Sequence, residues 1–420
     1  MIEARHRKEH RMLSIWIIVF GLLYIFAYQF KIPFKADTFL CGMAAGLIVM
    51  TFFAGKIIVS NQVILFFFVT MSSFIGLFYT TMPSEGLREA ILFAFFSVMF
   101  CLSLTNQWLI KSFVKWIYIV SVFVVLSSIL HFLAPTWFNA VMSRVMRDDA
   151  YEQLMWSFVV DKTFAGFAAY TPNTAFAAAV VFGNSLLNMA NNKETPVVKN
   201  KLLNVALLVL SLFSIIICSK RGVFVATIVA WIVLMFYLYR GRNFFQKFLG
   251  VAVLSSVVLV ILYNTNEFVA SFLNRFVGDD VLTGRDTIYK TLMTDFGESN
   301  FLIGRGTAAT YKLAEAGAHN IYMQILYDHG IVFSIPYYAL LFYNYYLAFR
   351  NRCPLSIFVQ TMFLVYGLSG NPLYSNMFMM IYIYHVLYAI RMPALSKNAN
   401  EHPITERNAN TTVGQKEQRA

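Results

Sequence analysis

The sequence predicts an all-α polytopic membrane protein with about 12 transmembrane helices. Of its 420 residues, 59% are hydrophobic and only 13% are charged, whereas ordinary soluble proteins have about 45–50% and about 25%. A soluble core cannot bury so much apolar surface, and apolar stretches long enough to cross a bilayer recur along the whole chain. These observations exclude a disordered, secreted or ordinary cytosolic protein.

Twelve apolar stretches reach or approach the length that crosses a bilayer as a helix. The predicted spans are residues 12–30, 38–55, 62–80, 89–105, 116–134, 166–190, 202–219, 222–239, 249–263, 330–349, 354–370 and 374–390. The first span follows a basic N-terminus, is too long for a signal-peptide core and lacks a small-residue cleavage site. We therefore expect it to remain as a signal anchor with its N-terminus in the cytoplasm.

The distribution of charge supports this arrangement of spans. With a cytoplasmic N-terminus, most of the 33 Lys and Arg residues lie on the cytoplasmic side, as the positive-inside rule requires. One long helix over 202–239 would send the basic cluster at 240–247 to the opposite side, so two separate spans are predicted there. Both termini are then cytoplasmic.

The chain is predicted to form a transmembrane helical domain over residues 1–394 and a disordered cytoplasmic tail over 395–420. Two predicted extracytoplasmic loops, at about 135–165 and 264–329, are longer than simple connections, and such loops are usually functional. The four cysteines have no CxxC spacing, so we expect no metal site.

Arg285, in the longer of these loops, lies at a predicted helix start. Thr283 can accept a hydrogen bond from the first turn, and Asp286 complements the positive helix end. Apolar residues then follow at helical spacing, which predicts an amphipathic helix over 284–296 at the membrane surface. An Arg side chain held on a helix is well suited to bind phosphate oxygens in pairs.

The same loop carries four more basic residues, Arg275, Lys290, Arg305 and Lys312. Long loops cross membranes regardless of charge, so we interpret Lys290 and Lys312 as solvated surface residues. The sequence Gly304-Arg305-Gly306 lacks the preceding strand and the third glycine of a phosphate-binding loop, and it indicates only a turn.

Lys220 and Arg221 lie in a short turn between two apolar runs that are each barely long enough to cross a bilayer. Two interpretations remain open. The two side chains either extend to the lipid headgroups, or they form fixed positive charges at the floor of an outward-facing cavity.

His319 and Asn320 end the longer loop, directly before an apolar helix. A single histidine is often a helix cap or a satisfied polar residue, yet histidine is also the side chain best placed to accept a proton near neutral pH. His319 is the one candidate base in this loop with a suitable unperturbed pKa. The histidines at 131, 329 and 385 are predicted to be structural.

These motifs resemble the O-antigen polymerase and ligase superfamily. The resemblance rests on Thr171-Pro-Asn173, Ser219-Lys-Arg-Gly222, Gly284-Arg285, Leu302-Ile-Gly-Arg-Gly306 and His319-Asn320 followed by Gly330. It covers mainly residues 202–349. It implies the C-type glycosyltransferase architecture, the bacterial plasma membrane, and transfer of a glycan from undecaprenyl pyrophosphate to an acceptor on the outer face.

The resemblance also implies the site. Arg221 and Arg285 are expected to hold the donor pyrophosphate, and His319 is expected to activate the acceptor hydroxyl. Residues expected to bind the substrate are Lys220, Arg305, Asn320, Arg275 and Asn173. The chemistry agrees, because guanidinium groups can stabilise a leaving pyrophosphate without a metal, and no cofactor is expected.

One departure from the family pattern separates the possible functions. Ligases of the family commonly carry Gly, Thr or Tyr three residues after the glycine of the histidine motif, but Phe333 stands there in this chain. Together with the Gly-x-Gly stretch, this favours a polymerase of O-antigen, capsule or exopolysaccharide. The alternative is a ligase that transfers polymer to the lipid A core.

A flippase for lipid-linked oligosaccharides is a more distant alternative, because such a carrier should place cations inside its helices. The predicted partners of a polymerase are an undecaprenyl-pyrophosphate-linked glycan donor, a lipid-linked glycan acceptor, the lipid bilayer, a chain-length regulator and a flippase. No nucleic acid is expected.

Overall fold

The protein is a helical bundle throughout the part of the chain that its structure, a computed structural model, describes. The described residues are 15, 17–19, 21, 29–31, 59–104, 107–190, 198, 200–238, 246, 249–250, 253, 257, 260–261, 263–265, 267–274, 276, 284–297, 301–314 and 317–401. Within these ranges no strand forms, and a single isolated bridge joins Phe30 to Met146.

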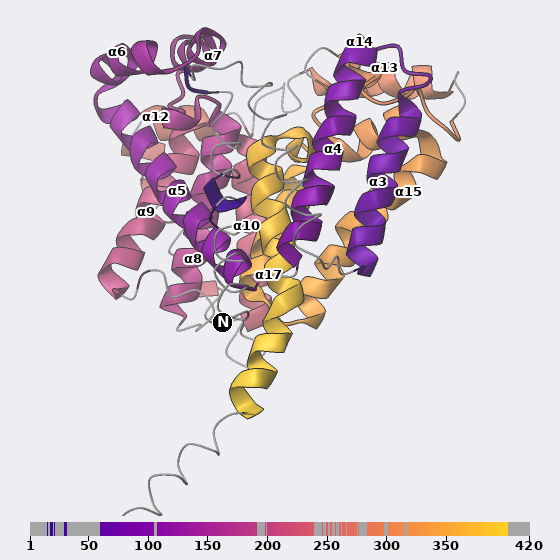
Figure 1. Ribbon diagram of the computed structural model, residues 1–420. Helices are drawn as coiled ribbons and strands as arrows, with labels where there is room; N and C mark the ends of the chain where they lie inside the picture. The colour runs from indigo at the N-terminus through magenta and orange to yellow at the C-terminus, as the bar shows by residue number, and fades with distance from the viewer. Residues whose placement is uncertain are drawn as a thin grey trace, which may run out of the picture.

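Nine of the twelve predicted spans coincide with helices (Figure 1). They are α3 (Asn61–Gly76), α4 (Pro83–Leu104), α5 (Gln107–Leu133), α8 (Thr171–Met189), α9 (Lys201–Ile217), α10 (Arg221–Leu238), α15 (Ile321–Arg350), α16 (Pro354–Tyr366) and α17 (Asn376–Glu401). The predicted spans at 12–30, 38–55 and 249–263 lie wholly or largely outside the described residues. Helices α9 and α10 are separate, as the charge distribution predicts.

Four helices in the described ranges, α4, α5, α10 and α15, are long and apolar enough to cross a membrane. Helices α3, α9 and α16 are equally apolar in character but shorter. The protein is therefore an all-α membrane protein, whereas the number of twelve spans stays a prediction.

Helices α8, α16 and α17 form the centre of the bundle. Residues 175–181 of α8 and 377–389 of α17 are buried on every side of the helix, which is typical of helices that lie in a protein interior. Helices α5 and α9 pack on α8, while α10 and α17 pack on α16. The yellow ribbon of α17 accordingly runs through the middle of the bundle in Figure 1.

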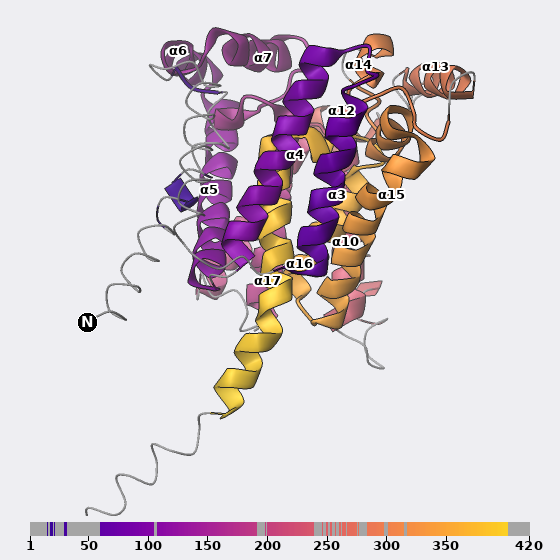
Figure 2. The ribbon, with the colours of Figure 1, turned by 45° about the vertical axis from the view of Figure 1, so that its right-hand side comes forward.

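Short helices from both predicted extracytoplasmic loops lie at one end of the bundle. Helices α6 (Pro135–Val145) and α7 (Asp148–Val159) come from the first loop, and α12 (Glu267–Asn274), α13 (Arg285–Gly297) and α14 (Thr310–Leu313) come from the second. Figure 2 keeps α6, α7, α13 and α14 at the upper end after a turn of the molecule. We call this the loop end of the bundle. Helix α13 coincides with the amphipathic helix predicted at 284–296.

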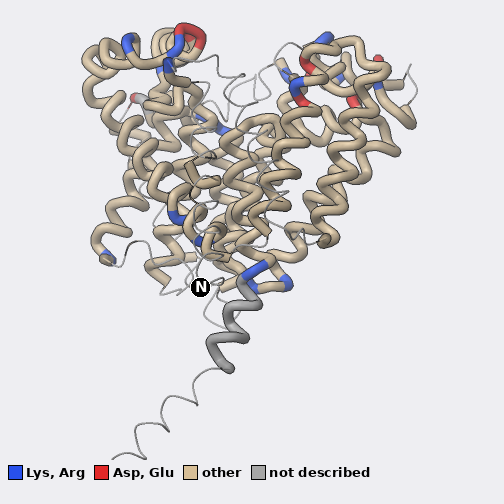
Figure 3. The backbone as a smooth tube through the Cα atoms, in the orientation of Figure 1, with Lys and Arg blue, Asp and Glu red and all other residues tan. Residues whose placement is uncertain are grey.

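Lys and Arg residues lie mainly toward the two ends of the bundle, as a membrane protein requires (Figure 3). At the end opposite the loops, α17 projects from the bundle and continues to Glu401, past residue 395 where the tail is predicted to begin. Residues 402–420 lie outside the described part of the chain.

Candidate active site

Six of the described α-helices begin within two residues of a left-handed backbone position. The residues with positive φ are Ala169 (56°), Ser219 (52°), Gly284 (74°), Ala308 (65°), His319 (52°) and Arg352 (53°), which precede α8, α10, α13, α14, α15 and α16 respectively. A residue other than glycine adopts this conformation at a cost, and such positions concentrate at functional sites. The N-terminus of each helix also carries a partial positive charge.

Side chains from three of these helix starts lie within electrostatic reach of one another. Burial lowers the pKa of His319, and the positive charges of Arg285 and Lys220 lower it further. Lys220 belongs to the turn before α10, Arg285 is the first residue of α13, and His319 stands just before α15. We call these three residues the cationic cluster.

Two tyrosines lie beside Arg285. Burial raises the pKa of Tyr170 and of Tyr289, and the charge of Arg285 opposes that rise in both. Tyr289 is one turn after Arg285 on α13, and its hydroxyl lies within hydrogen-bonding reach of Asn320. The helical spacing of Arg285 and Tyr289 could have indicated this second residue, whereas nothing local to Tyr170 predicts its place.

Asn320 fixes the start of α15. Its side-chain oxygen accepts hydrogen bonds from the backbone N–H groups of Tyr322 (3.0 Å) and Met323 (3.2 Å), as a helix N-cap does. The N–H of Ile321 donates to the carbonyl of Gly367 at the end of α16, at 2.9 Å. The backbone directly after His319 is therefore anchored at Asn320 and at Ile321.

The turn that carries Lys220 is anchored on the same part of α16. Gly222 packs so closely against Ser369 that a Cβ atom at position 222 would collide with the Ser369 hydroxyl. A glycine is therefore required by this close approach of α10 to the end of α16. Because α15 and α10 both start against residues 367–369, Lys220 and His319 are held in a fixed relation.

Lys220 has one acidic neighbour that the sequence analysis does not identify. Its Nζ lies 3.9 Å from the Asp161 carboxylate, and the two side chains are 33% and 36% exposed. Asp161 follows α7 in the first long loop, so the two residues meet only in the folded chain. An ion pair of this length and exposure contributes little to stability, at most about 1 kcal/mol.

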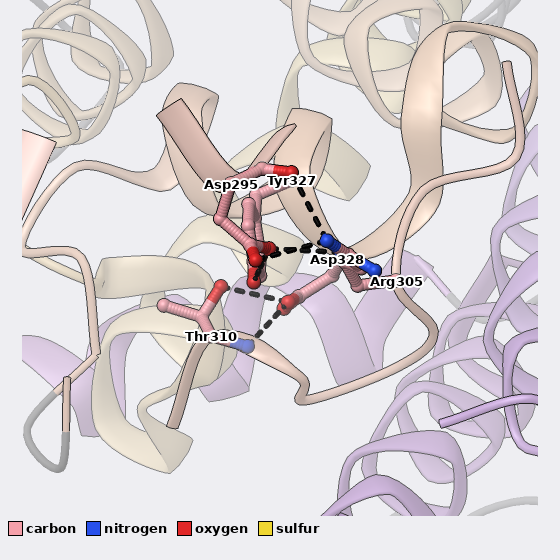
Figure 4. A network of polar contacts seen from close by, with 5 residues as sticks. All are labelled: Asp295, Arg305, Thr310, Tyr327 and Asp328. Carbon is pink, nitrogen blue, oxygen red and sulfur yellow. Dashed lines mark hydrogen bonds and ion pairs between the residues drawn. The ribbon is translucent and has the colours of Figure 1, made fainter. Parts of the chain in front are cut away.

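Arg305 is engaged by an aspartate of α13 (Figure 4). Its Nε donates to Asp295 Oδ2 at 2.8 Å, and its Nη2 donates to Asp295 Oδ1 at 2.9 Å and to the Asp295 carbonyl at 3.1 Å. The hydroxyl of Tyr327, on α15, donates to the same carboxylate at 2.6 Å. We call Asp295, Arg305 and Tyr327 the clamp, because they join α13 to α15.

In the clamp, the negative charge of Asp295 balances the positive charge of Arg305, as in a structural ion pair. Burial raises the pKa of Asp295, but the hydrogen bonds from Tyr327 and Arg305 and the Arg305 charge outweigh it and hold that pKa below its usual value. Beside the clamp, Leu292 of α13 packs with Ala309, Ala318 and Tyr327. The apolar face predicted for this helix therefore rests on the loop and on α15.

The other predicted site residues have different surroundings. Arg221 is the first residue of α10 and is half-buried. Asn173 is in the first turn of α8, where its side-chain oxygen accepts a hydrogen bond from Ser375 at 3.4 Å. Arg275 lies outside the described residues. The structure thus brings Lys220, Arg285, His319 and Asn320 together and engages Arg305 in the clamp.

Among the residues with described positions, no group of three or more His, Cys, Asp or Glu side chains is placed to hold a metal ion. The cluster offers instead two cations and an imidazole, which together suit an anion and a proton transfer.

Comparison with protein families identifies the middle of the chain. Residues 206–338 match the family model described as O-antigen ligase, while no curated protein matches the chain. The matched segment includes Lys220, Arg285 and His319 and falls within the residues that carry the resemblance. Members of the family are glycosyltransferase-like enzymes. This match supports the resemblance of residues 202–349 to the superfamily of O-antigen polymerases and ligases.

Proposed function

We propose that this protein is a polysaccharide polymerase of the bacterial plasma membrane. It transfers a glycan from undecaprenyl pyrophosphate onto another lipid-linked repeat unit, at the extracytoplasmic face. The polymer is an O-antigen, a capsule or an exopolysaccharide. The observation that carries the proposal is the meeting of Lys220, Arg285 and His319 at the loop end of a membrane bundle.

The transfer requires stabilisation of the leaving pyrophosphate and a base for the acceptor hydroxyl, and the cationic cluster supplies both. The acceptor hydroxyl attacks the anomeric carbon of the donor, the new glycosidic bond forms, and the bond from that carbon to the phosphate oxygen breaks. Undecaprenyl pyrophosphate leaves with the electron pair, and the charge on it is stabilised by Arg285, Lys220 and Arg221. The hydroxyl proton passes to the imidazole of His319.

The electrostatics of the cluster favour histidine as the base. The pKa of His319 lies below its ordinary value, so the imidazole is neutral at neutral pH and can accept a proton. A bound pyrophosphate cancels the charge of Lys220 and Arg285 and raises this pKa again. The acid limb of kcat should therefore lie at a higher pH than the acid limb of kcat/KM, because kcat reports the donor complex.

The experiment that tests the function is deletion of the gene in its native host, followed by analysis of the lipid-linked glycans. A polymerase mutant accumulates glycolipid with a single repeat unit, and the wild-type gene restores the ladder of longer chains. Complementation with the His319→Ala variant should leave the glycans at one repeat unit. Normal ladders in the deletion strain would refute the proposal.

The second candidate is a ligase, because the matched family model covers polymerases and ligases alike. A ligase uses the same lipid-linked donor but passes the finished polymer to the lipid A core. In the deletion strain it would leave long polymer on undecaprenyl pyrophosphate and none on lipid A. The length of the accumulated glycan therefore decides between the two functions.

A further inference from the structure

Two carboxyl groups are buried near the loop end of the bundle. Glu89 of α4 is 6% exposed and Asp328 of α15 is 0% exposed. Each lies about two turns inside the start of its helix, and the two groups interact electrostatically. Neither residue belongs to the cationic cluster, so the proposed reaction gives no reason for their presence.

Their hydrogen bonds differ. Asp328 Oδ1 accepts two hydrogen bonds from Thr310, one from the backbone N–H and one from the hydroxyl, each of 2.7 Å (Figure 4). No donor in the described part of the chain forms a hydrogen bond of ordinary geometry with Asp328 Oδ2 or with either oxygen of Glu89, although the Tyr311 hydroxyl lies beside Glu89. Donors to a carboxylate favour its charged form, so the charge belongs on Asp328.

Among the described residues, no buried cation faces the pair to balance a second negative charge. The titratable and charged groups facing the pair are Tyr311 of α14, Tyr374 of η2 (Pro372–Tyr374), Tyr337 of α15 and Arg88 of α4. Arg88 is exposed. The neighbouring His329 pairs its Nε2 with the Tyr337 hydroxyl at 2.9 Å. Two like charges in such an environment cannot both persist, so one carboxyl must hold a proton.

Asp328 lies where the loop before His319 is fastened to the bundle. Its carbonyl accepts from Gly306 N–H at 2.8 Å, and Thr307 Oγ1 donates to the Ser73 carbonyl of α3 at 2.6 Å. The buried Gln324, which interacts with Asp328, accepts from the N–H of Ala318 at 3.4 Å. Contacts of Asp328 and its neighbours thus extend from Gly306 to the residue directly before His319.

We propose that Glu89 and Asp328 share one proton, carried by Glu89, and that the charged Asp328 positions the loop that holds His319. Asp328 and Glu89 are positioning residues, because they act through His319 rather than on the substrate. The part of this inference that concerns His319 rests on the proposed function, whereas the shared proton does not.

The test compares Glu89→Gln with Asp328→Asn in the full-length protein, purified and reconstituted in liposomes with the single-repeat glycolipid extracted from the deletion strain. Gln replaces a neutral carboxyl with a neutral group of the same shape, so kcat should stay within about threefold of the wild type. Asn removes the charge that holds Thr310, and kcat should fall about 100-fold with the donor KM little changed, as expected when a base is displaced by about 1 Å.

Thr310 provides the matched pair of variants. Thr310→Ser retains the hydroxyl and should keep wild-type kcat, whereas Thr310→Val loses one donor to Asp328 and should lower kcat in the same direction as Asp328→Asn. A purely structural defect would appear instead as a lower yield of monodisperse protein in all of these variants.

Infrared difference spectroscopy tests the proton without any glycan substrate. The carbonyl stretch of a protonated carboxylic acid, which shifts in D₂O, should be present in the wild type and in Asp328→Asn and lost in Glu89→Gln. Absence of this band from the wild type would overturn the shared proton. A metal cation in place of the proton would also overturn the proposal. It would appear as activity that depends on sodium or a divalent ion in the wild type but not in Glu89→Gln.

The two proposals can fail separately. An inactive Glu89→Gln variant beside an active Asp328→Asn variant would overturn the positioning role. Equal activity of the wild type and His319→Ala would instead refute the proposed function, and the infrared band would still decide the protonation of the pair.

Discussion

Arg285 and Arg305 belong to the same predicted outer loop, yet they have opposite surroundings. Arg305 places its guanidinium on the Asp295 carboxylate through two hydrogen bonds. No carboxylate in the described part of the protein forms an ion pair with Arg285, which stands beside His319 and adds to the positive charge around it. The comparison teaches that a basic residue indicates an anion site only where the fold leaves its charge unbalanced.

The same contrast separates the cationic cluster from the clamp. In the clamp, the attractive charges contribute at most about 1 kcal/mol at a partly exposed position. In the cationic cluster, the charges of Arg285 and Lys220 both disfavour a protonated His319, and the one acidic group paired with Lys220 in the described residues, Asp161, lies 3.9 Å from it. An arrangement that is unfavourable without an anion is suited to bind one. Four sets of variants test this distinction.

Replacement of His319 should have the largest effect on the cationic cluster. The variant His319→Ala removes the proposed base, so kcat should fall about 100- to 10,000-fold. The protein should still insert into the membrane at the wild-type level, because the hydrogen bonds of Asn320 and Ile321 do not use the imidazole. Measurement of glycan chain length and of membrane-inserted protein in the same cells checks this. Normal chain-length ladders would remove His319 from the mechanism.

Replacement of Arg285 should have the next largest effect. Arg285→Ala removes a donor to the leaving group and should lower kcat about 100- to 1,000-fold. Arg285→Lys keeps the charge without the planar guanidinium fork, so its kcat should lie between that of the wild type and that of Arg285→Ala. The control is Lys290→Ala, which removes an exposed cation from the same helix and should leave the rate unchanged. Equal losses in the two alanine variants would mean that only the net charge of α13 matters.

Replacement of Lys220 should shift the pH dependence of the reaction. Lys220→Gln removes a charge that lowers the pKa of His319, so this pKa should rise toward its ordinary value. Because the neutral imidazole is the active form, the acid limb of kcat/KM should move to higher pH. Lys220→Arg keeps the charge and should retain the wild-type profile. An unchanged profile in Lys220→Gln would place Lys220 outside the cationic cluster.

Disruption of the clamp should have the smallest effect. Asp295→Asn and Arg305→Ala should each lower stability by about 0.2–1 kcal/mol, and the double variant should lose no more than the larger single loss. Thermal unfolding in detergent measures this, and the donor KM should not change. A rise in KM for Arg305→Ala as large as that for Arg285→Ala would make Arg305 a substrate ligand, as the sequence motif suggests.

Local patterns predict much of the cationic cluster. The helix that begins at Arg285 follows from its capping residues and apolar spacing, and the helix directly after His319 and Asn320 follows from the apolar residues there. The separation of α9 from α10 follows from the positive-inside rule. These features depend on residues within a few positions of one another, which sequence patterns record directly.

Contacts between distant segments are not predictable in this way. Asp161 lies in the first long loop and Lys220 follows α9, so only the packing of the helices brings them to 3.9 Å. The clamp likewise joins α13, the following loop and α15. Nothing in the Gly304-Arg305-Gly306 motif distinguishes an arginine that pairs with a carboxylate from one that binds a substrate.

The sequence by itself determined the solvent of this protein and predicted its chemistry. Its apolar runs require a bilayer, and its basic residues with His319 indicate an anion and a proton transfer, because these properties belong to residue types and short-range spacing. The tertiary structure decided which charges are balanced and which are not. It places Asp295 on Arg305, brings Arg285 and Lys220 within electrostatic reach of His319, and buries both Glu89 and Asp328. The physical reason is that electrostatic energies depend on distance and burial in the folded chain, which no single segment specifies.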